Sequence, residues 1–301
     1  MKTNIPAGAT APAGQPNYDT REKPMQSRKS TIILLVAFLI GLSVLLYPTI
    51  SSYWNSKTQS EAIVDYEAML ANYKPEDYSV LFEAAENYNK ALGKLKNPLA
   101  EHRQLTNYGN VLNISGTGMM GYITIPKIGQ ELPVYHGTSE AVLSLAVGHL
   151  EGTSLPVGGE STHCVVSAHR GLPTAVLFTH LDRMEVGDIF YFTILDRTLT
   201  YEVDQIRIVT PDDTSLIQIV EGKDYCTLLT CTPYGINTQR LLVRGHQVDA
   251  SQIKNIYIAN DAYRVDPLIV MSGVALFIIV WLLVYVMFAP VKKEQLGEDT
   301  I

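Results

Sequence analysis

The chain has 301 residues and is acidic, with 23 Lys and Arg against 30 Asp and Glu and a formal net charge of −7 at pH 7. Nucleic-acid binding needs a basic face, so this balance excludes a nucleic-acid partner. The three cysteines show no CxxC spacing. This argues against a zinc site, and we expect neither a metal nor another cofactor.

The N-terminal part predicts a tail followed by a membrane helix. Residues 1–30 are rich in Pro, Ala, Gly, Thr and charge, which predicts a disordered cytoplasmic tail. Residues 31–50 carry no charge and are close to the minimum length that crosses about 30 Å of hydrocarbon. A cleaved signal peptide is the alternative, but Tyr53 and Trp54 suit an interfacial aromatic belt better than a cleavage site. We therefore predict a retained transmembrane helix.

A second apolar segment lies at residues 267–290 and precedes a short tail, residues 291–301. Basic residues flank both segments on their outer sides, with Arg28 and Lys29 before the first and Lys292 and Lys293 after the second. The positive-inside rule then places both termini in the cytoplasm. The prediction is a two-pass protein of the cell membrane whose middle part is extracellular.

The extracellular part divides by its hydrophobic periodicity. Residues 51–118 contain two stretches with helical spacing of apolar residues, 59–73 and 75–95, and predict a helical extension. Residues 119–250 consist of short β-branched and aromatic runs separated by Gly and Pro, and residues 251–266 form a linker. The predicted strands are 121–128, 132–135, 162–168, 188–195, 199–210, 224–231 and 241–248, with brief helices at 140–146 and 174–177. Seven or eight such strands indicate a mainly β domain built as a closed barrel.

Three candidate catalytic residues lie at the ends of these runs. The run 225–230 delivers Cys231 into a turn that contains Pro233 and Gly235, and Arg240 opens the return run. His169 follows another apolar run that also stops at a turn. An ordinary thiol is only a few per cent thiolate at about pH 7, so a nucleophilic cysteine needs a neighbouring cation or imidazolium. A thiol, a base and a fixed cation together predict a cysteine acyl-transfer enzyme.

Other residues compete for two of these roles. His136 and His149 are the rivals of His169 that spacing alone does not exclude. The rivals of Arg240 are Arg170, which stands beside His169, and Arg244. Strand side chains alternate with period two, which directs Arg240 and Arg244 to the same face.

Three separated blocks resemble the sortases, and specifically the pilin-polymerising class C sortases of Gram-positive bacteria. The blocks are Thr230-Cys231 with Arg240, the segment from Ser167 to Pro173, and the segment from Gly148 to Pro156; the likeness covers about Gly121 to Val248. The resemblance implies a sortase-like barrel of about eight strands, with His169, Cys231 and Arg240 as the catalytic residues. It assigns the role of base to His169 and leaves Thr230 and Arg244 at the rim of the substrate site.

The resemblance also implies a reaction and its partners. Cys231 would cleave an LPXTG-like sorting signal between Thr and Gly, form a thioester, and pass the acyl group to a lysine amine of another pilin. The alternatives are a housekeeping-type sortase that anchors surface proteins to a cell-wall precursor and, in another enzyme class, a thiol peptidase that uses water. A further alternative is a catalytically inactive adhesin or pilus-assembly scaffold.

Two features stay open at this stage. Class C sortases usually carry a lid with an Asp-Pro-aromatic motif, and Asn97-Pro98-Leu99 stands at the comparable place without the carboxylate or the ring. A turn that ends a helix explains Asn-Pro equally well. If the strands that carry Cys164 and Cys226 run side by side in parallel, as the resemblance implies, these two cysteines lie close together, either as a disulfide or as buried thiols.

Overall fold

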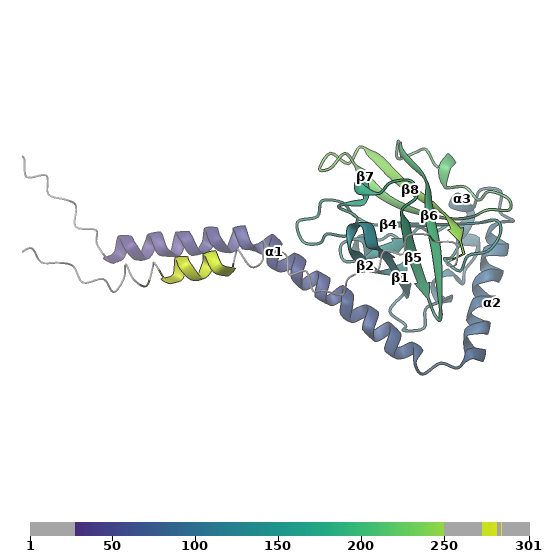
Figure 1. Ribbon diagram of the computed structural model, residues 1–301, viewed down its shortest axis with the longest axis horizontal. Helices are drawn as coiled ribbons and strands as arrows, with labels where there is room; N and C mark the ends of the chain where they lie inside the picture. Colours follow the sequence, from purple (N-terminus) through teal and green to yellow (C-terminus); the bar gives the residue numbers. More distant parts are fainter. Residues whose placement is uncertain (1–27, 250–272, 282–283, 285–301) are drawn as a thin grey trace, which may run out of the picture. The chain divides into compact units, whose positions relative to one another are not determined.

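The computed structural model describes residues 28–249, 273–281 and 284. The chain divides into two compact units, Met1–Leu45 and Leu46–Ile301. Helix α1 (Arg28–Leu70) begins in the first unit and is drawn in purple in Figure 1. It continues through Pro48 into the stretch that was predicted as a separate helix from residue 59. The separation of these two helices in the prediction is therefore wrong.

Among the described residues, one helical stretch, Leu35–Leu70, is long and apolar enough to cross a membrane. Apolar side chains in its first half, such as Ile40 and Val44, are exposed, as expected of a surface that faces lipid. Residues 273–281 and 284 are also helical. The described residues include almost nothing of three other predicted parts. These are the rest of the second membrane segment (267–290), the linker (251–266) and the two tails. The two-pass topology stays a prediction.

The second unit contains a closed barrel of eight strands in the order β1-β2-β3-β4-β7-β8-β6-β5. This confirms the predicted mainly β barrel. Neighbouring strands are antiparallel except for β2 with β3 and β4 with β7, which are parallel. The strands are β1 (Met119–Ile125), β2 (Gln130–His136), β3 (Val147–His149), β4 (Thr162–Ser167), β5 (Ile189–Ile194), β6 (Arg197–Val209), β7 (Asp224–Thr232) and β8 (Gln239–Val248).

Short helices connect and cover these strands. Within residues 28–249 the α-helices are α1, α2 (Pro75–Leu92), α3 (Pro98–Glu101) and α4 (Glu140–Leu143). The 3₁₀ turns are η1 (His102–Gln104), η2 (Tyr108–Asn110), η3 (Pro126–Ile128), η4 (Leu181–Arg183) and η5 (Ser215–Ile217). The predicted helix at 174–177 is wrong. Those residues form turns, and Leu177 has a φ of 42°, outside the right-handed helical region.

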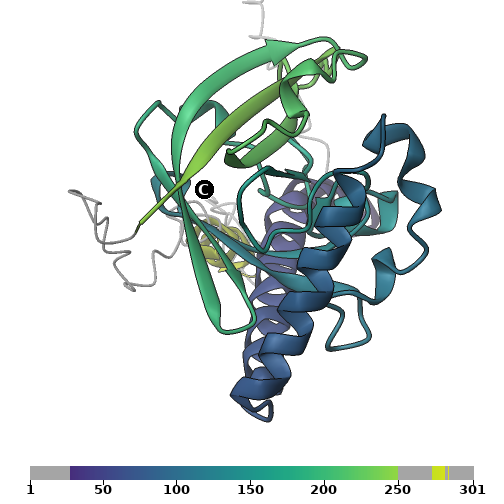
Figure 2. The same cartoon turned by 90° about the vertical axis from the view of Figure 1, so that its right-hand side faces the viewer.

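The helical extension closes over the apolar interior of the barrel. Phe82, Tyr88 and Leu92 on α2 are buried in the same cluster as Phe190 and Phe192 of β5. Helix α2 faces the viewer in Figure 2.

One polar side chain fixes this arrangement. Asn89 donates from Nδ2 to the Leu155 carbonyl (3.0 Å) and accepts from the Leu155 amide (2.7 Å). A buried amide that pairs with both groups of one peptide position leaves none of these polar groups unsatisfied. The contact therefore ties α2 to the segment that follows β3.

Candidate active site

Cys231 and Arg240 face each other across the β7–β8 hairpin. In the antiparallel register Cys231 pairs with Arg240, as Thr230 does with Leu241. Directly opposed residues in an antiparallel ladder present their side chains on the same face, with Cβ atoms about 5 Å apart. Leu241 and Val243 lie in the barrel core, whereas Leu242 belongs to a separate cluster. The thiol and the guanidinium therefore share the outer face of the barrel.

His169 reaches this place from the neighbouring strand. Strand β4 runs parallel to β7, and Ser167 pairs with Leu229. The pairing continues beyond β4, because the Ala168 amide donates to the Leu229 carbonyl (3.2 Å) and Thr230 Oγ1 donates to the Ala168 carbonyl (2.8 Å). Extending this register by one more residue puts His169 level with Cys231. Thr230, predicted at the rim, is fully buried and instead joins the ends of the two strands.

The turn after Cys231 packs on the loop after His169. Gly171 has a φ of 77°, and a Cβ added there would lie 2.8 Å from the Tyr234 ring. The Arg170 guanidinium lies 5.9 Å from the centre of the same ring and makes an ion pair of 2.8 Å with Asp182. A glycine at position 171 therefore gives both the left-handed backbone and the space that this contact requires.

Arg240 and Arg244 differ in what they bind. Arg240 Nη1 donates to the carbonyls of Asn237 (3.2 Å) and Gln239 (3.0 Å), both on its own turn. Arg244 makes two bonds of 2.9 Å to the Asp204 carboxylate and stacks 4.1 Å from the centre of the Tyr225 ring. Arg244 is thus committed to a bidentate pair with one carboxylate, while Arg240 bonds only backbone carbonyls through Nη1 and makes no ion pair among the described residues.

The two rival histidines are held by structural contacts. His149 is fully buried; Nε2 lies 2.8 Å from the Ser154 carbonyl and Nδ1 lies 2.9 Å from the Tyr108 hydroxyl. Burial lowers the pKa of His149 to about 4. His136 lies between the carbonyls of Gly118 and Val111, at 2.8 Å from each. Neither ring is open to a substrate, whereas the side chain of His169 is 29% exposed.

An apolar cluster lies on the same outer face beside the three residues. It joins Val165 of β4 and Leu242 of β8 with Leu229 of β7, which stands two positions before Cys231. Leu99, from the segment predicted as a possible lid, packs against this cluster.

Contacts with the segment after β3 hold Leu99 in place. A Cβ on Gly152 would lie 2.8 Å from the Leu99 Cα and 2.9 Å from the Pro98 carbonyl. Asn97 caps α3 by accepting from the Ala100 amide (3.4 Å). The segment 97–99 thus lies against the face that carries Cys231, although its asparagine has a local structural role.

Cys164 and Cys226 pair in the β4–β7 register, and both are buried free thiols. Burial raises the pKa of the Cys164 thiol well above its ordinary value, and the adjacent Cys226 adds to the effect. These thiols pack as apolar groups. Cys231 is half-buried and also free. Among the described residues, no group of His, Cys, Asp and Glu could hold a metal ion.

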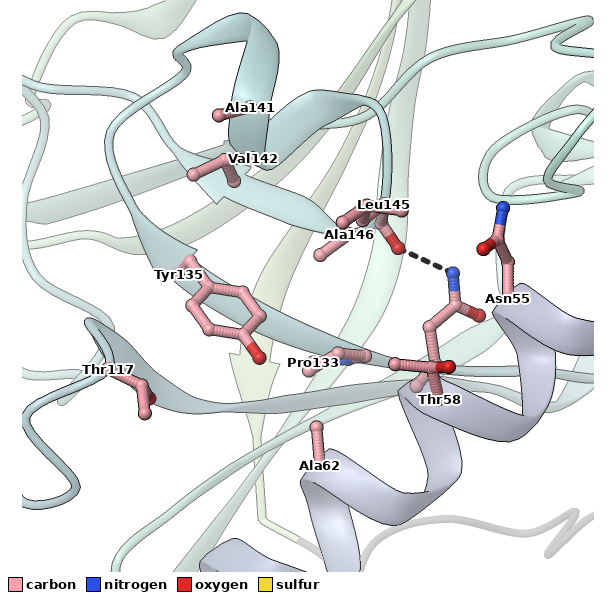
Figure 3. Close-up of a pocket in the computed structure, with 11 residues that line it drawn as sticks. Asn55, Thr58, Ala62, Thr117, Pro133, Tyr135, Ala141, Val142, Leu145 and Ala146 are labelled. Carbon is pink, nitrogen blue, oxygen red and sulfur yellow. Dashed lines mark hydrogen bonds between the residues drawn. The ribbon is translucent and has the colours of Figure 1, made fainter.

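A cavity of about 300 Å³ lies elsewhere, between α1 and the segment from β2 to β3 (Figure 3). Its apolar side comes from α4 and β2, including Val142 and Pro133, and its polar groups include the amides of Asn55 and Gln59 on α1. The catalytic candidates do not line it. The cavity is therefore distinct from the site on β4, β7 and β8.

Comparisons with known proteins identify this barrel. The family model described as a sortase domain matches residues 123–248. The crystal structure of sortase C1 from Streptococcus agalactiae is 50% identical and has a TM-score of 0.59, with 63% of this chain and 98% of that chain covered. The chain belongs to the sortase family. Sortase C structures from Streptococcus pneumoniae (45% identical, 63% and 97% covered, TM-score 0.57) and Clostridium perfringens SM101 (43%, 63% and 99%, 0.53) place this sortase nearest class C.

Curated relatives agree with this family. Sortase D of Bacillus subtilis is 33% identical over 131 residues, which are 42% of this chain and 63% of that protein. Sortase A of Streptococcus agalactiae serotype III is 30% identical over 128 residues, which are 42% of this chain and 51% of that protein. This sortase thus spans between about half and two thirds of the length of the two relatives.

Proposed function

We propose that this sortase is a membrane-anchored cysteine transpeptidase with Cys231 as nucleophile, His169 as acid and base, and Arg240 as the cation that stabilises the oxyanion. The register that brings these residues to one face carries the proposal. Cys231 and Arg240 lie on paired strands of one sheet, and His169 follows β4, whose pairing with β7 continues as far as Ala168, so backbone hydrogen bonds limit how far the three residues can separate. Such preorganisation is what a charge-stabilising site requires.

The chemistry follows from these roles. The Cys231 thiolate attacks the Thr carbonyl carbon of an LPXTG-like signal, and Arg240 hydrogen-bonds the oxygen that becomes negative. The Thr–Gly C–N bond then breaks while the His169 imidazolium gives its proton to the leaving glycine amine, which leaves a thioester on Cys231. A lysine amine attacks the thioester, its proton passes to His169, and the thiolate leaves as an isopeptide bond forms.

We propose pilins as both the acyl donor and the amine acceptor. The support is the similarity to sortase C structures, one of which is described as a pilus-related sortase C of Group B Streptococcus and is 41% identical with 98% of that chain covered. The acidic extracellular part suits a cationic lysine acceptor: residues 51–266 hold 16 Lys and Arg against 25 Asp and Glu. Surface-protein anchoring to a cell-wall precursor is the second candidate, since curated relatives include sortases A.

The apolar cluster beside Cys231 is the place where the Leu and Pro of a sorting signal would bury their side chains. Leu99 already covers part of this cluster. We therefore propose that segment 97–99 acts as a lid that a substrate displaces, with Leu99 in place of the aromatic residue of the usual motif.

Product analysis tests the function. Full-length protein in detergent micelles is incubated with an LPXTG-like peptide together with a pilin domain that contains the acceptor lysine and a cell-wall precursor amine, and the products are identified by mass spectrometry. We expect a peptide linked to the lysine and no linked product with Cys231→Ala. A free peptide acid with no linked product would instead support a thiol peptidase, and linkage only to a cell-wall precursor amine would support anchoring.

A further inference from the structure

A carboxylate from outside the barrel lies beside His169. Glu140 Oε2 is 3.6 Å from His169 Nε2, an ion pair when the ring is protonated. Nε2 itself is buried and has no hydrogen-bond partner. Because the side chain is nevertheless 29% exposed, its other atoms account for that exposure. Glu140 therefore faces the buried nitrogen of the ring, and the exposed atoms of the side chain lie elsewhere on it.

Contacts with α1 hold the short helix α4, which begins at Glu140. Gln59 of α1 donates to the Leu145 carbonyl at 2.6 Å, the dashed line in Figure 3. Ala141 and Val142, the residues after Glu140, line the cavity between α4 and α1 in the same view. A second α1 amide, Asn55, donates to the Thr174 carbonyl (2.8 Å) in the loop that follows His169. Helix α1 thus holds both the segment that carries the carboxylate and the loop after the histidine.

The other charged groups near His169 have partners of their own. Arg170, next in the chain, pairs with Asp182 at 2.8 Å and donates to Thr232 Oγ1 at 3.3 Å. Arg240 donates to carbonyls of its own turn. Cys231 stands across the register as the proposed nucleophile. Among the described residues, Glu140 is the carboxylate that pairs with this ring.

We propose that Glu140 is a positioning residue that orients the His169 ring for donation of a proton to the leaving amine. The inference rests on the proposed function, because it assigns the acid to His169. Glu140 does not touch the reacting atoms and acts through the ring. Sequence spacing gives no signal for it, since residues 140 and 169 meet only when α4 is packed against the barrel.

The expected effect is modest and depends on salt. The side chain of Glu140 is 83% exposed, so water and ions screen its charge. Exposed pairs of this kind change an equilibrium by about two- to fivefold at low ionic strength.

The experiment compares Glu140→Gln with Glu140→Asp and with Glu160→Gln in full-length protein. Glu160 is exposed and lies before the first residue of β4, whereas His169 lies after its last, so Glu160→Gln removes the same charge at the other end of the strand. The measurement is kcat/KM for thioester formation from a sorting peptide, as a function of pH at low and high salt. For Glu140→Gln we expect kcat to fall about two- to fivefold with KM for the sorting peptide unchanged, and the loss to be larger at low salt than at high salt.

The matched variants and salt make the outcome decisive. Glu140→Asp should restore part of the wild-type profile, Glu160→Gln should match wild type, and about 1 M salt should bring Glu140→Gln and wild type together. An unchanged kcat for Glu140→Gln at low salt, or a change confined to KM for the amine acceptor, overturns the positioning role. If wild type itself forms no thioester, the proposed function fails, and that result is distinct from failure of this inference.

Discussion

Two kinds of element contribute to the same face of the barrel, and they do so by different physical means. One is the set of strands β4, β7 and β8, and the other is the pair of short helices α3 and α4. Backbone pairing between β7 and β8 holds Cys231 opposite Arg240, and the β4–β7 pairing, which continues as far as Ala168, places His169 directly after it. The helices bring Leu99 and Glu140 through a few contacts, one apolar and one electrostatic. We therefore expect substitutions of residues fixed by the strand register to cause large losses of activity or stability. Substitutions of residues that the covering helices bring to the face should cause smaller, graded changes.

The largest contrast lies within β8 itself. Arg240→Ala should lower kcat/KM about 10²- to 10³-fold, because it removes a preorganised cation from the oxyanion, and it should leave the free energy of unfolding nearly unchanged. Arg244→Ala should do the reverse. It strands the Asp204 carboxylate, which is only 24% exposed, and should cost about 2 kcal/mol of stability with little loss of kcat. Urea unfolding and steady-state kinetics on both variants check this, and equal kinetic losses would contradict it.

Acid should weaken the scaffold around His149 and His163. Burial lowers the pKa of each ring from its ordinary 6.5 to about 4. The unfolded chain takes up a proton below about pH 6.5 and the folded chain does so only near pH 4, so stability should fall as pH falls through this window. The loss is at most about 3 kcal/mol for each ring. Asp224 acts in the opposite direction, because burial raises the pKa of its carboxyl group.

Unfolding in urea between about pH 7 and pH 4.5 measures this dependence. His149→Gln should flatten the slope of stability against pH by about half, even if the variant is less stable at neutral pH. An unchanged slope would show that His149 is not a source of the acid sensitivity.

A smaller effect is expected at the lid segment. Leu99→Ala together with Asn97→Ala should increase the rate at which a thiol reagent labels Cys231 by roughly two- to tenfold, because Leu99 covers part of the adjacent apolar cluster. Peptide mapping by mass spectrometry separates Cys231 from the buried Cys164 and Cys226. Leu95→Ala, a change in the segment between α2 and α3, serves as the control. Equal labelling rates in the double variant and wild type would contradict the proposal that segment 97–99 acts as a lid.

Sequence patterns predicted the strands that carry the site because alternation and turn residues are local. Cys231 before a Pro-Gly turn and Arg240 on the return strand are features of one hairpin, and the structure places them opposite each other. Strand β3 was missed because three residues, Val147–His149, are too few to show alternation. Helix α1 was divided because the charge-free stretch ends near residue 50 and the helical spacing of apolar residues was recognised again only from residue 59.

The partners of the charged residues could not be predicted, because they depend on packing between distant segments. Asp204 meets Arg244 where the β6–β8 register shifts between Val203 and Gln205, and no alternation pattern predicts such a bulge. Glu140 meets His169 only through the position of α4. The placement of Cys231 and Arg240 on one hairpin was therefore predictable from the sequence, whereas the partners of the charged side chains were not.

The central claim is that Cys231 becomes acylated by a sorting signal, and trapping that thioester tests it most directly. Full-length protein is mixed with an LPXTG-like peptide in the absence of an amine acceptor, quenched in acid, and digested for mass spectrometry. We predict that the fragment containing Cys231 gains the mass of the peptide acyl group cut after Thr, that hydroxylamine removes it, and that Cys231→Ala gains nothing. Cleavage of the peptide by the Cys231→Ala variant, or an acyl group on a residue other than Cys231, would contradict the account.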